Sequence, residues 1–286
     1  MPLQVQPLEL PDFDILISHA SSDPPGDDLV APPNPVAWPV STQAEAQTRA
    51  RHCFALQRRR FLRDPTTNFV KVVDVDNNGA AAAGDIIAVA RWHFYPQGYD
   101  YSTEAHWEMA PTAPLMAYLR GHKAKRQGET ANDNHPQDRP EGSEGLEGYN
   151  DDDNVYPPPN FNLALHNHIL SSRDSFRPTW VPDRHPCWVL MHLVTRPSQR
   201  RRGAAGLLIR WGLERAREMG VDAYLEAGVQ GRPVYLKFGF EQVGPDRRVD
   251  LRDHVGEAAG VPSEFVLANM KWSPKGQAGK SSDGDE

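Results

Sequence analysis

A short basic loop of small residues is the stretch of this sequence best suited to bind an anion. It reads Arg200-Arg201-Arg202-Gly203-Ala204-Ala205-Gly206 and is followed by an amphipathic stretch. Glycine and alanine allow a ligand to approach the backbone closely, and the first N–H groups of a helix have no partner within the helix. Together with the helix dipole and the arginine charges, these donors predict a site for an anion such as a pyrophosphate.

The elements around this loop form a predicted strand–helix–strand unit. Residues 188–194 are almost continuously apolar, which is typical of a strand buried on both faces. Residues 204–219 carry an apolar stripe at helical spacing, and Gly220 follows where a helix commonly ends. A further strand is predicted over 221–227 and a short helix over 233–238. The loop therefore lies where a strand gives way to the N-terminus of a helix.

The rest of the sequence predicts elements on both sides of this unit. We expect strands over 3–8, 69–75, 85–95, 240–243 and 265–272, and helices from residue 11, over 44–63 and over 161–177. Within 44–63, the run Arg58-Arg59-Arg60 is interpreted as a solvated face. Residues 121–159 are polar, acidic and rich in Gly, Asn and Pro, which predicts a disordered insertion. We therefore expect one domain over 1–272 and a disordered tail over 273–286.

The composition favours a protein of the cytoplasm. The 286 residues carry a formal net charge of −7, which argues against general binding to nucleic acid or anionic membranes. There are two cysteines, Cys53 and Cys187, so a disulfide framework is not expected. No apolar run is long enough to cross a membrane, and the first residues lack the pattern of a signal peptide. We expect no metal site, and the sequence does not indicate an oligomeric state.

The strand–loop–helix unit resembles the GNAT superfamily of acyl-CoA-dependent N-acyltransferases. The family signature, Arg/Gln-x-x-Gly-x-Gly/Ala after a strand, is matched by residues 200–205, with Pro197 three residues before it. A later family element, an aromatic residue followed by a Gly-Phe pair, is matched by Tyr235 and by Gly239-Phe240. The resemblance covers about residues 187–243. It implies an α/β (α+β) fold with a mixed, largely antiparallel central sheet, splayed middle strands and flanking helices.

The resemblance also implies how acetyl-CoA, the expected co-substrate, would bind. The diphosphate would lie against the loop, at Arg200, Arg201, Arg202, Gly203, Ala204, Ala205 and Gly206. The pantetheine arm would pair, like an added strand, with the exposed backbone of Leu193, Val194 and Thr195. The hydroxyl of Tyr235 would lie near the sulfur and protonate the departing thiolate. The alternative interpretation of Tyr235 is an aromatic residue that packs a short helix onto the sheet.

An amine acceptor adds the need for a base. An alkyl amine is mostly protonated at neutral pH and must lose a proton before it attacks. Glu226 is the first candidate and His192, on the facing strand, the second; a chain of water molecules is a further alternative. Either residue could instead be structural, Glu226 as an ordinary polar strand residue and His192 as a core histidine.

Three aromatic residues end a predicted strand that lies near the acceptor site in this family. Trp92, His93 and Phe94 are interpreted either as a wall of the acceptor site or as simple core packing.

Three functions fit these features. The first is acetyl transfer from acetyl-CoA to a primary amine of a small molecule, by direct attack in a ternary complex, since neither cysteine lies in the motif. The sequence pattern LEA…RPVY…FGF resembles the fungal small-molecule branch of the family. The second is acetylation of protein lysines or N-termini. The third is a CoA-binding module without catalysis, which stays open because Gly228 stands where many relatives have an Asn.

Overall fold

One sheet runs through the residues that the computed structural model describes, which are 2–21, 24–31, 34–75, 81–100, 160–255 and 262–274. Its eight strands in this part of the chain are β1 Leu3–Pro7, β2 Thr67–Val75, β3 Ala81–Tyr95, β4 Cys187–Thr195, β5 Asp222–Gly228, β6 Glu241–Gln242, β7 Arg247–Asp250 and β8 Glu264–Trp272. The order across the sheet is β1-β2-β3-β4-β5-β8-β6, and β7 pairs with the start of β8. Neighbouring strands are antiparallel except β4 and β5, which are parallel. The predicted mixed, largely antiparallel sheet is confirmed.

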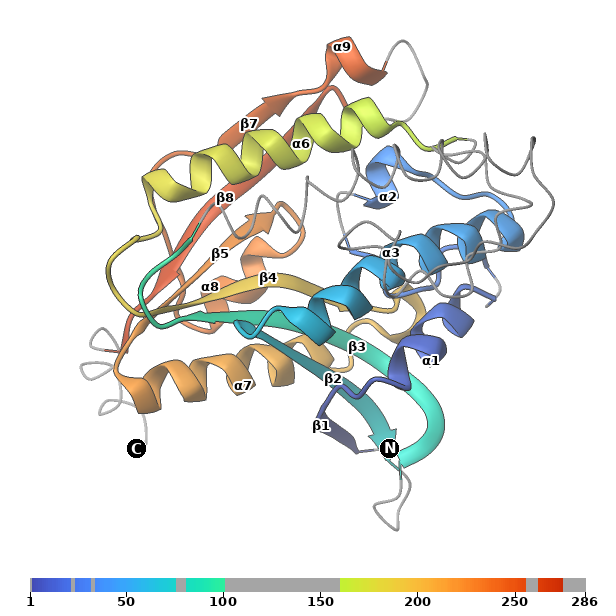
Figure 1. Cartoon of the computed structure of the whole chain (residues 1–286), viewed down its shortest axis with the longest axis horizontal. Coiled ribbons are helices and arrows are strands. Elements are labelled where there is room, and N and C mark those ends of the chain that lie inside the picture. Colours follow the sequence, from blue (N-terminus) through green and yellow to red (C-terminus); the bar gives the residue numbers. More distant parts are fainter. Residues whose placement is uncertain are drawn as a thin grey trace, which may run out of the picture.

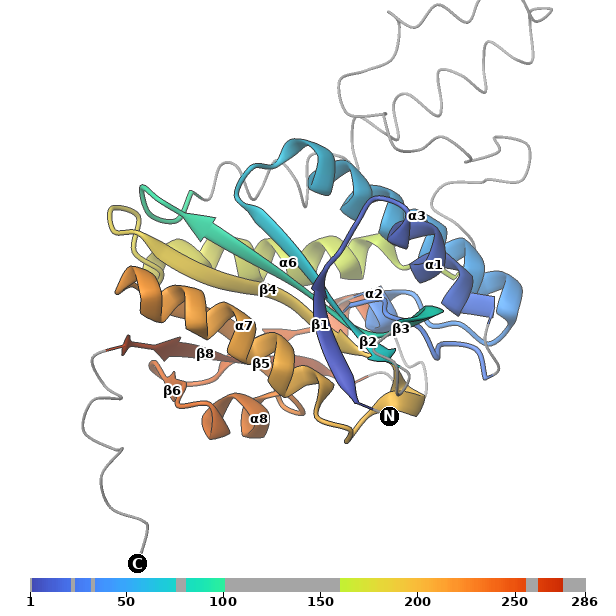
Figure 2. The same cartoon turned by 90° about the horizontal axis from the view of Figure 1, so that it is seen from below.

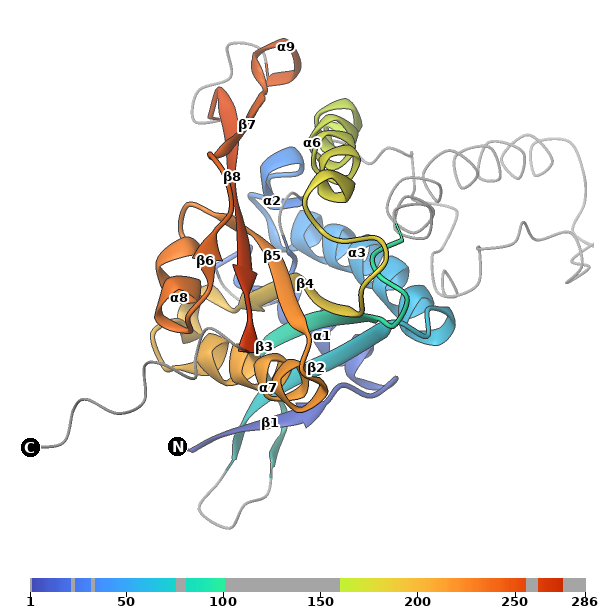
Figure 3. The same cartoon turned by 90° about the vertical axis from the view of Figure 1, so that its left-hand side faces the viewer.

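Helices cover both faces of this sheet (Figure 1). They are α1 Asp12–Ser18, α2 Asn34–Ala37, α3 Gln43–Arg63, α6 Leu163–Phe176, α7 Ala204–Met219, α8 Arg232–Lys237 and α9 Arg252–Val255, with the 3₁₀ helices η1 His19–Ser21, η4 Arg177–Thr179 and η5 Pro197–Gln199. Helix α7 lies on one face, where Figure 2 shows it alongside β4 and β5, and α3 and α6 lie on the other face (Figure 3).

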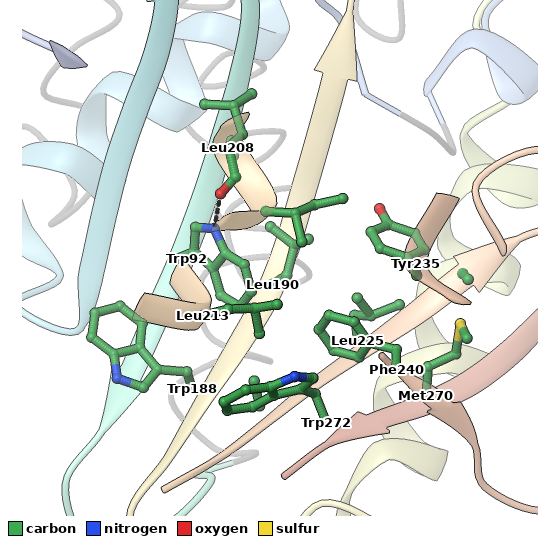
Figure 4. Packing of buried hydrophobic residues seen from close by; sticks show 14 of the residues in the cluster. Trp92, Trp188, Leu190, Leu208, Leu213, Leu225, Tyr235, Phe240, Met270 and Trp272 are labelled. Atoms are coloured by element: carbon green, nitrogen blue, oxygen red, sulfur yellow. Dashed lines mark hydrogen bonds between the residues drawn. The ribbon is translucent and has the colours of Figure 1, made fainter. Parts of the chain in front are cut away.

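Helix α7 packs directly on a tryptophan of β3. The Cβ that a side chain at Gly212 would add comes within 2.2 Å of Cε2 of Trp92, so only glycine allows this approach. The indole Nε1 of Trp92 donates a hydrogen bond to the carbonyl of Leu208 at 3.2 Å (Figure 4). Gly220 ends the helix with a φ of 67°, as the sequence predicts. The contacts of Leu208 and Gly212 with Trp92 fix the position of α7 on the sheet.

Helix α3 begins where the sequence supplies a capping box. The Thr42 hydroxyl accepts a hydrogen bond from the N–H of Glu45, and the Glu45 carboxylate accepts one from the N–H of Thr42. The interpretation of Arg58-Arg59-Arg60 as a solvated face is wrong for the last two residues. Arg59 is 8% and Arg60 2% exposed, because this side of α3 packs toward the sheet, where Arg60 Nη1 lies 3.5 Å from His93 Nε2.

Other predictions differ in detail or fall outside the described residues. The strand expected from residue 85 begins at Ala81, and the short elements α2, β7 and α9 were not predicted. The insertion expected over 121–159 and the tail from 275 lie outside the described residues. Among the helices that are described, none is both long and apolar enough to cross a membrane.

Candidate active site

The middle of the sheet opens between β4 and β5. Their parallel pairing ends with Leu190 opposite Leu225. Beyond this pair, β4 continues along β3 as far as Thr195, and β5 continues along β8 as far as Gly228. The expected splay therefore lies between residues 191–195 and residues 226–228. Within the described part of the chain, no strand pairs with this side of Leu193, Val194 and Thr195, so their backbone is available to an added strand.

A β-bulge lies at the point where the two strands part. Arg91 of β3 faces His192, whereas the next residue, Trp92, faces Leu190. Met191 is therefore an extra residue on β4, and an extra residue bends its strand and increases the local twist. The bulge accounts for the splay, and the sequence analysis did not predict it.

The candidate catalytic residues lie on two different faces of this opening. Tyr235 belongs to the hydrophobic cluster beneath α7, together with Leu190 and Leu225. Val194 packs against the cluster beneath α1 and α3, and His192 shares its face because side chains two residues apart on a strand point the same way. Leu225 points toward α7, and successive side chains of a strand point to opposite faces. Glu226 therefore points away from α7. The structure therefore places Tyr235 on one side and His192 and Glu226 on the other.

The basic loop adopts the backbone expected of an anion site. Arg201 and Gly203 have φ values of 66° and 91°, which curl the loop, and α7 begins at Ala204. The first helical hydrogen bond is donated by Leu207 to Gly203 at 3.2 Å, so the N–H groups of residues 204–206 precede the helical ladder. A Cβ at Gly203 would meet nothing within 4 Å, so the space beside this residue is open.

The three arginines of the loop differ in their surroundings. Arg200 and Arg201 are exposed. Arg202 instead binds Asp74 on β2, with Nη2 to Oδ1 at 2.6 Å and Nη1 to Oδ2 at 2.8 Å. This ion pair holds the pKa of Asp74 below its usual value. Arg202 therefore anchors the loop to the sheet, whereas Arg200 and Arg201 remain directed to solvent.

Asp27 is a second anchor of this loop, and sequence reasoning missed it. Its carboxylate accepts hydrogen bonds from the N–H and hydroxyl of Ser198 at 2.8 and 2.7 Å, and from Arg196 at 3.0 Å. Burial would raise the pKa of Asp27, but the hydrogen bonds from Ser198 and the charge of Arg196 outweigh burial and lower it. The partner residues are distant in sequence, so only the fold brings them together.

Gly206 links the loop to the helix that carries Tyr235. A Cβ at Gly206 would lie 2.9 Å from Cζ of Phe238, the residue that directly follows α8. The absence of a side chain therefore lets the start of α7 and the end of α8 pack together. Through this contact, the anion loop and the helix of Tyr235 form one packed unit.

Tyr235 is 9% exposed and packs edge-on against Phe240, with ring centroids 5.9 Å apart. Its hydroxyl points away from Leu225 and Phe240 (Figure 4) and makes no hydrogen bond to another described residue. Burial raises the pKa of Tyr235, because the phenolate would lose its hydration. The hydroxyl therefore keeps its proton at neutral pH and is present there as a donor.

Glu226 is bound to Arg177, which sequence reasoning did not single out. The two carboxylate oxygens accept hydrogen bonds from Nε and Nη2 of Arg177 at 2.6 and 2.7 Å. Burial alone would lower the pKa of Arg177, but the charge of Glu226 raises it well above its usual value. Both carboxylate oxygens are thus already engaged by one guanidinium, which argues against Glu226 as the base.

The structure separates the three aromatic residues of β3 from the opening. Trp92 lies beneath α7, and His93 lies on the α3 side, where Nδ1 is 3.0 Å from the Thr66 hydroxyl; neither side chain is exposed. Phe94 packs against Trp188, with ring centroids 5.3 Å apart. This burial argues against direct contact of Trp92 or His93 with an acceptor and favours the core-packing interpretation.

The part of the chain that is described contains no group of three or more His, Cys, Asp or Glu side chains able to hold a metal ion. Its two cysteines, Cys53 and Cys187, are buried and unbridged. At Gly228, the position of the Asn found in many relatives, a Cβ would meet nothing within 4 Å. Space for a ligand is therefore open at both Gly203 and Gly228.

Part of the chain matches a known protein family. Residues 154–240 match the family described as Acetyltransferase (GNAT) family. The match confirms the predicted resemblance to that superfamily. No curated protein matches the sequence.

Several solved structures resemble the chain at low identity. Arylalkylamine N-acetyltransferase 2 from Aedes aegypti gives a TM-score of 0.46 at 14% identity, covering 96% of this chain and 100% of that one. Polyamine N-acetyltransferase from Drosophila melanogaster gives 0.43 at 13%, covering 95% and 100%. A Corynebacterium glutamicum protein described as histone acetyltransferase HPA2 and related acetyltransferase gives 0.42 at 16%, covering 96% and 97%. Identities this low do not transfer a substrate to this chain.

Proposed function

We propose that this chain, whose acetyltransferase domain is of the GNAT type, transfers an acetyl group from acetyl-CoA to the primary amine of a small molecule. The observation that carries the proposal is the junction of an anion loop, open at Gly203, with the gap between β4 and β5. The loop would hold the diphosphate through its N–H groups and through Arg200 and Arg201. The backbone of residues 193–195 would pair with the pantetheine arm, which directs the thioester into the gap.

The two proton transfers of the reaction would take place on opposite faces of the sheet. The amine nitrogen attacks the thioester carbonyl, the C–S bond breaks, and the sulfur leaves as a thiolate. Tyr235, beneath α7, donates its proton to that thiolate. His192, on the other face, accepts the proton that the ammonium group loses before it attacks, and the second proton, which the nitrogen sheds as the amide forms, leaves through solvent and restores the phenol of Tyr235. Glu226, the first candidate base of the sequence analysis, is assigned no proton transfer here, because both of its oxygens are bound to Arg177.

The packing of α6 supports a small acceptor. This helix lies on the face of the sheet that carries His192, where the amine would bind. Helix α6 packs against α2 and β7 through a cluster that includes Trp38, Phe161, Leu165, Ile169 and Val249. The next residue after α6, Arg177, is tied to β5 beside the opening. A peptide acceptor requires an open groove, whereas this contact ties the end of α6 to the strand that borders the opening. Acetylation of protein amines remains the second candidate function.

The proposal is tested by measuring thiol release from acetyl-CoA with small amines and with peptides that carry a lysine or a free N-terminus. We expect release with small amines, matched by formation of their N-acetyl products. Release with peptides alone would favour the protein acetyltransferase. Binding of acetyl-CoA in a calorimeter, together with no release for any acceptor, would favour a module that binds CoA without catalysis.

A further inference from the structure

A buried ion pair joins the end of α6 to the middle of β5. The Arg177 side chain is 1% and the Glu226 side chain 8% exposed. Their contact is bidentate, with Nε to Oε1 at 2.6 Å and Nη2 to Oε2 at 2.7 Å. Such a contact fixes the direction of both side chains as well as their separation.

Glu226 occupies a defined place relative to the opening in the sheet. Leu225 makes the last pair with β4, so Glu226 is the first residue of β5 beyond that pairing. Its backbone remains paired with Asn269 of β8, which is 4% exposed. The carboxylate therefore projects from a rigid strand, at the edge of the opening, toward the face that carries His192.

Arg177 gathers groups from two further segments. Its Nη1 donates a hydrogen bond to the hydroxyl of Tyr99, which follows β3, at 3.2 Å. The same nitrogen lies 3.5 Å from Oδ1 of Asp174 on α6. Asp174 is fully buried, and its Oδ2 has no hydrogen-bond partner in the described structure. One guanidinium thus connects the chain after β3, the end of α6 and β5.

Stability alone does not explain this arrangement. Removing two charges from water costs several kcal/mol per ion, and well-packed apolar residues often replace a buried ion pair without loss of stability. The best-attested benefit of such a pair is that it selects one arrangement of the elements it joins. Here those elements are the end of α6 and β5, the strand that borders the opening.

We propose that Arg177 and Glu226 are positioning residues for the amine acceptor. The ion pair holds the end of α6 against β5, so that the acceptor enters the opening on the side of His192 and at a fixed distance from the thioester. The inference rests on the proposed function. It assigns the pair no proton transfer and no contact with the cofactor, which would lie against the loop before α7 and the backbone of residues 193–195.

The test compares Arg177→Met and Glu226→Gln with Arg248→Met and Glu264→Gln, which break an exposed Arg–Glu pair between β7 and β8. Kinetics are measured with phenethylamine and putrescine over a range of pH. Each variant of the buried pair should raise the KM for the amine roughly tenfold, and the double variant should cost less than the product of the two single effects, as expected for residues that interact. The KM for acetyl-CoA and the pH profile should be unchanged, and the control variants should behave as wild type.

Three results would overturn the inference. The first is an unchanged KM for the amine in both variants of the buried pair. The second is an equal loss of affinity for acetyl-CoA, which would indicate a general structural role. The third is loss of the acidic limb of the pH profile in Glu226→Gln, which would identify Glu226 as the base after all.

Amine binding is also measured by calorimetry in the presence of CoA. If wild type releases no thiol with any amine, the proposed function fails. The calorimetric comparison of wild type with Glu226→Gln, using the same two amines, still decides whether the pair positions an amine. Weaker binding by the variant supports that role, and equal binding or no binding by either protein contradicts it.

Discussion

The guanidinium of Arg202 lies 2.6 Å from the carboxylate of Asp74, although the two residues belong to segments far apart in the sequence. This contact ties the anion loop to β2. The Arg202 side chain is therefore directed at Asp74 and is not a candidate ligand of the diphosphate. The side chains of Arg200 and Arg201 are exposed on the same loop. Three consecutive arginines thus divide into one anchor and two candidate ligands.

Arg200→Gln and Arg201→Gln should each weaken the binding of acetyl-CoA. A hydrogen bond to a charged group contributes about 1.5–3 kcal/mol, so we expect roughly a tenfold rise in Kd or more for each variant, measured by calorimetry. Neither variant should change the free energy of unfolding beyond about 0.5 kcal/mol, because both side chains are exposed.

Arg202→Gln is the matched comparison within the same loop. It leaves the largely buried carboxylate of Asp74 without its guanidinium, so the free energy of unfolding should fall by more than in the other two variants. If Arg202→Gln instead weakened cofactor binding with no loss of stability, the assignment of Arg202 as an anchor would be incorrect.

Gly203→Ala and Gly220→Ala form a matched pair at the two ends of α7. Both glycines have left-handed φ values, 91° and 67°, and a Cβ at either position would meet nothing within 4 Å. Each variant should therefore lose about 1 kcal/mol of unfolding free energy through backbone strain. Only Gly203→Ala should weaken acetyl-CoA binding, since only its methyl group would lie where the diphosphate approaches. Equal effects on binding would show that the ligand lies elsewhere.

Much of the fold follows from local sequence patterns. The strand–loop–helix–strand unit was predicted over 188–227, because an apolar run, a small-residue loop and a helical stripe are each visible within one short window. The strands expected over 69–75 and 85–95, which correspond to β2 and β3, were predicted from their β-branched and apolar residues. The bulge at Met191 could not be predicted, because it is a relation of register between two strands and leaves no mark in residue type.

The contacts that shape the candidate site are mostly long-range. Arg177 and Glu226 are separated by 49 positions and Arg202 and Asp74 by 128, so no local pattern connects them. The burial of Arg60 likewise could not be predicted from the local sequence. An arginine in a run of charges is ordinarily solvated, and its burial at 2% exposure depends on which side of α3 faces the sheet.

Tyr235→Phe should lower kcat by about 10²- to 10⁴-fold, the usual contribution of a positioned acid, with acetyl-CoA binding unchanged. The hydroxyl makes no hydrogen bond within the described structure, so its removal should not lower stability. Tyr224→Phe is the control, because the Tyr224 hydroxyl donates to Asp222 in the closed part of the β4–β5 pair. A similar kcat for wild type and Tyr235→Phe would remove Tyr235 from the mechanism.

His52 should make stability depend on pH. It lies on α3 among Trp38 and Phe161, and burial, with a smaller effect of His166, lowers its pKa from 6.5 to about 4. Above pH 6.5 the folded and unfolded states are both neutral at this residue. As the pH falls from 6.5 toward 4, the unfolded state binds a proton at His52 that the folded state does not bind. The free energy of unfolding therefore falls.

The expected loss at pH 5 is about 2 kcal/mol relative to pH 7, from about 1.4 kcal/mol per pH unit below 6.5. Urea unfolding is measured at both pH values. Between pH 7 and pH 5, His52→Gln should lose less free energy of unfolding than wild type, by that amount. His185→Gln, at an exposed histidine, should behave like wild type. An undiminished acid loss in His52→Gln would assign the effect to other groups.

The central claim is direct transfer of the acetyl group from acetyl-CoA, bound in the opening between β4 and β5, to an amine. A single-turnover experiment tests it most directly: the protein is mixed with stoichiometric acetyl-CoA, an amine is added, and protein, thiol and product are followed by mass spectrometry. We predict free CoA and N-acetylated amine in equal amounts, and no gain in protein mass before the amine is added. An acetylated protein that forms first, or acetyl-CoA that stays intact with every amine, would contradict the account.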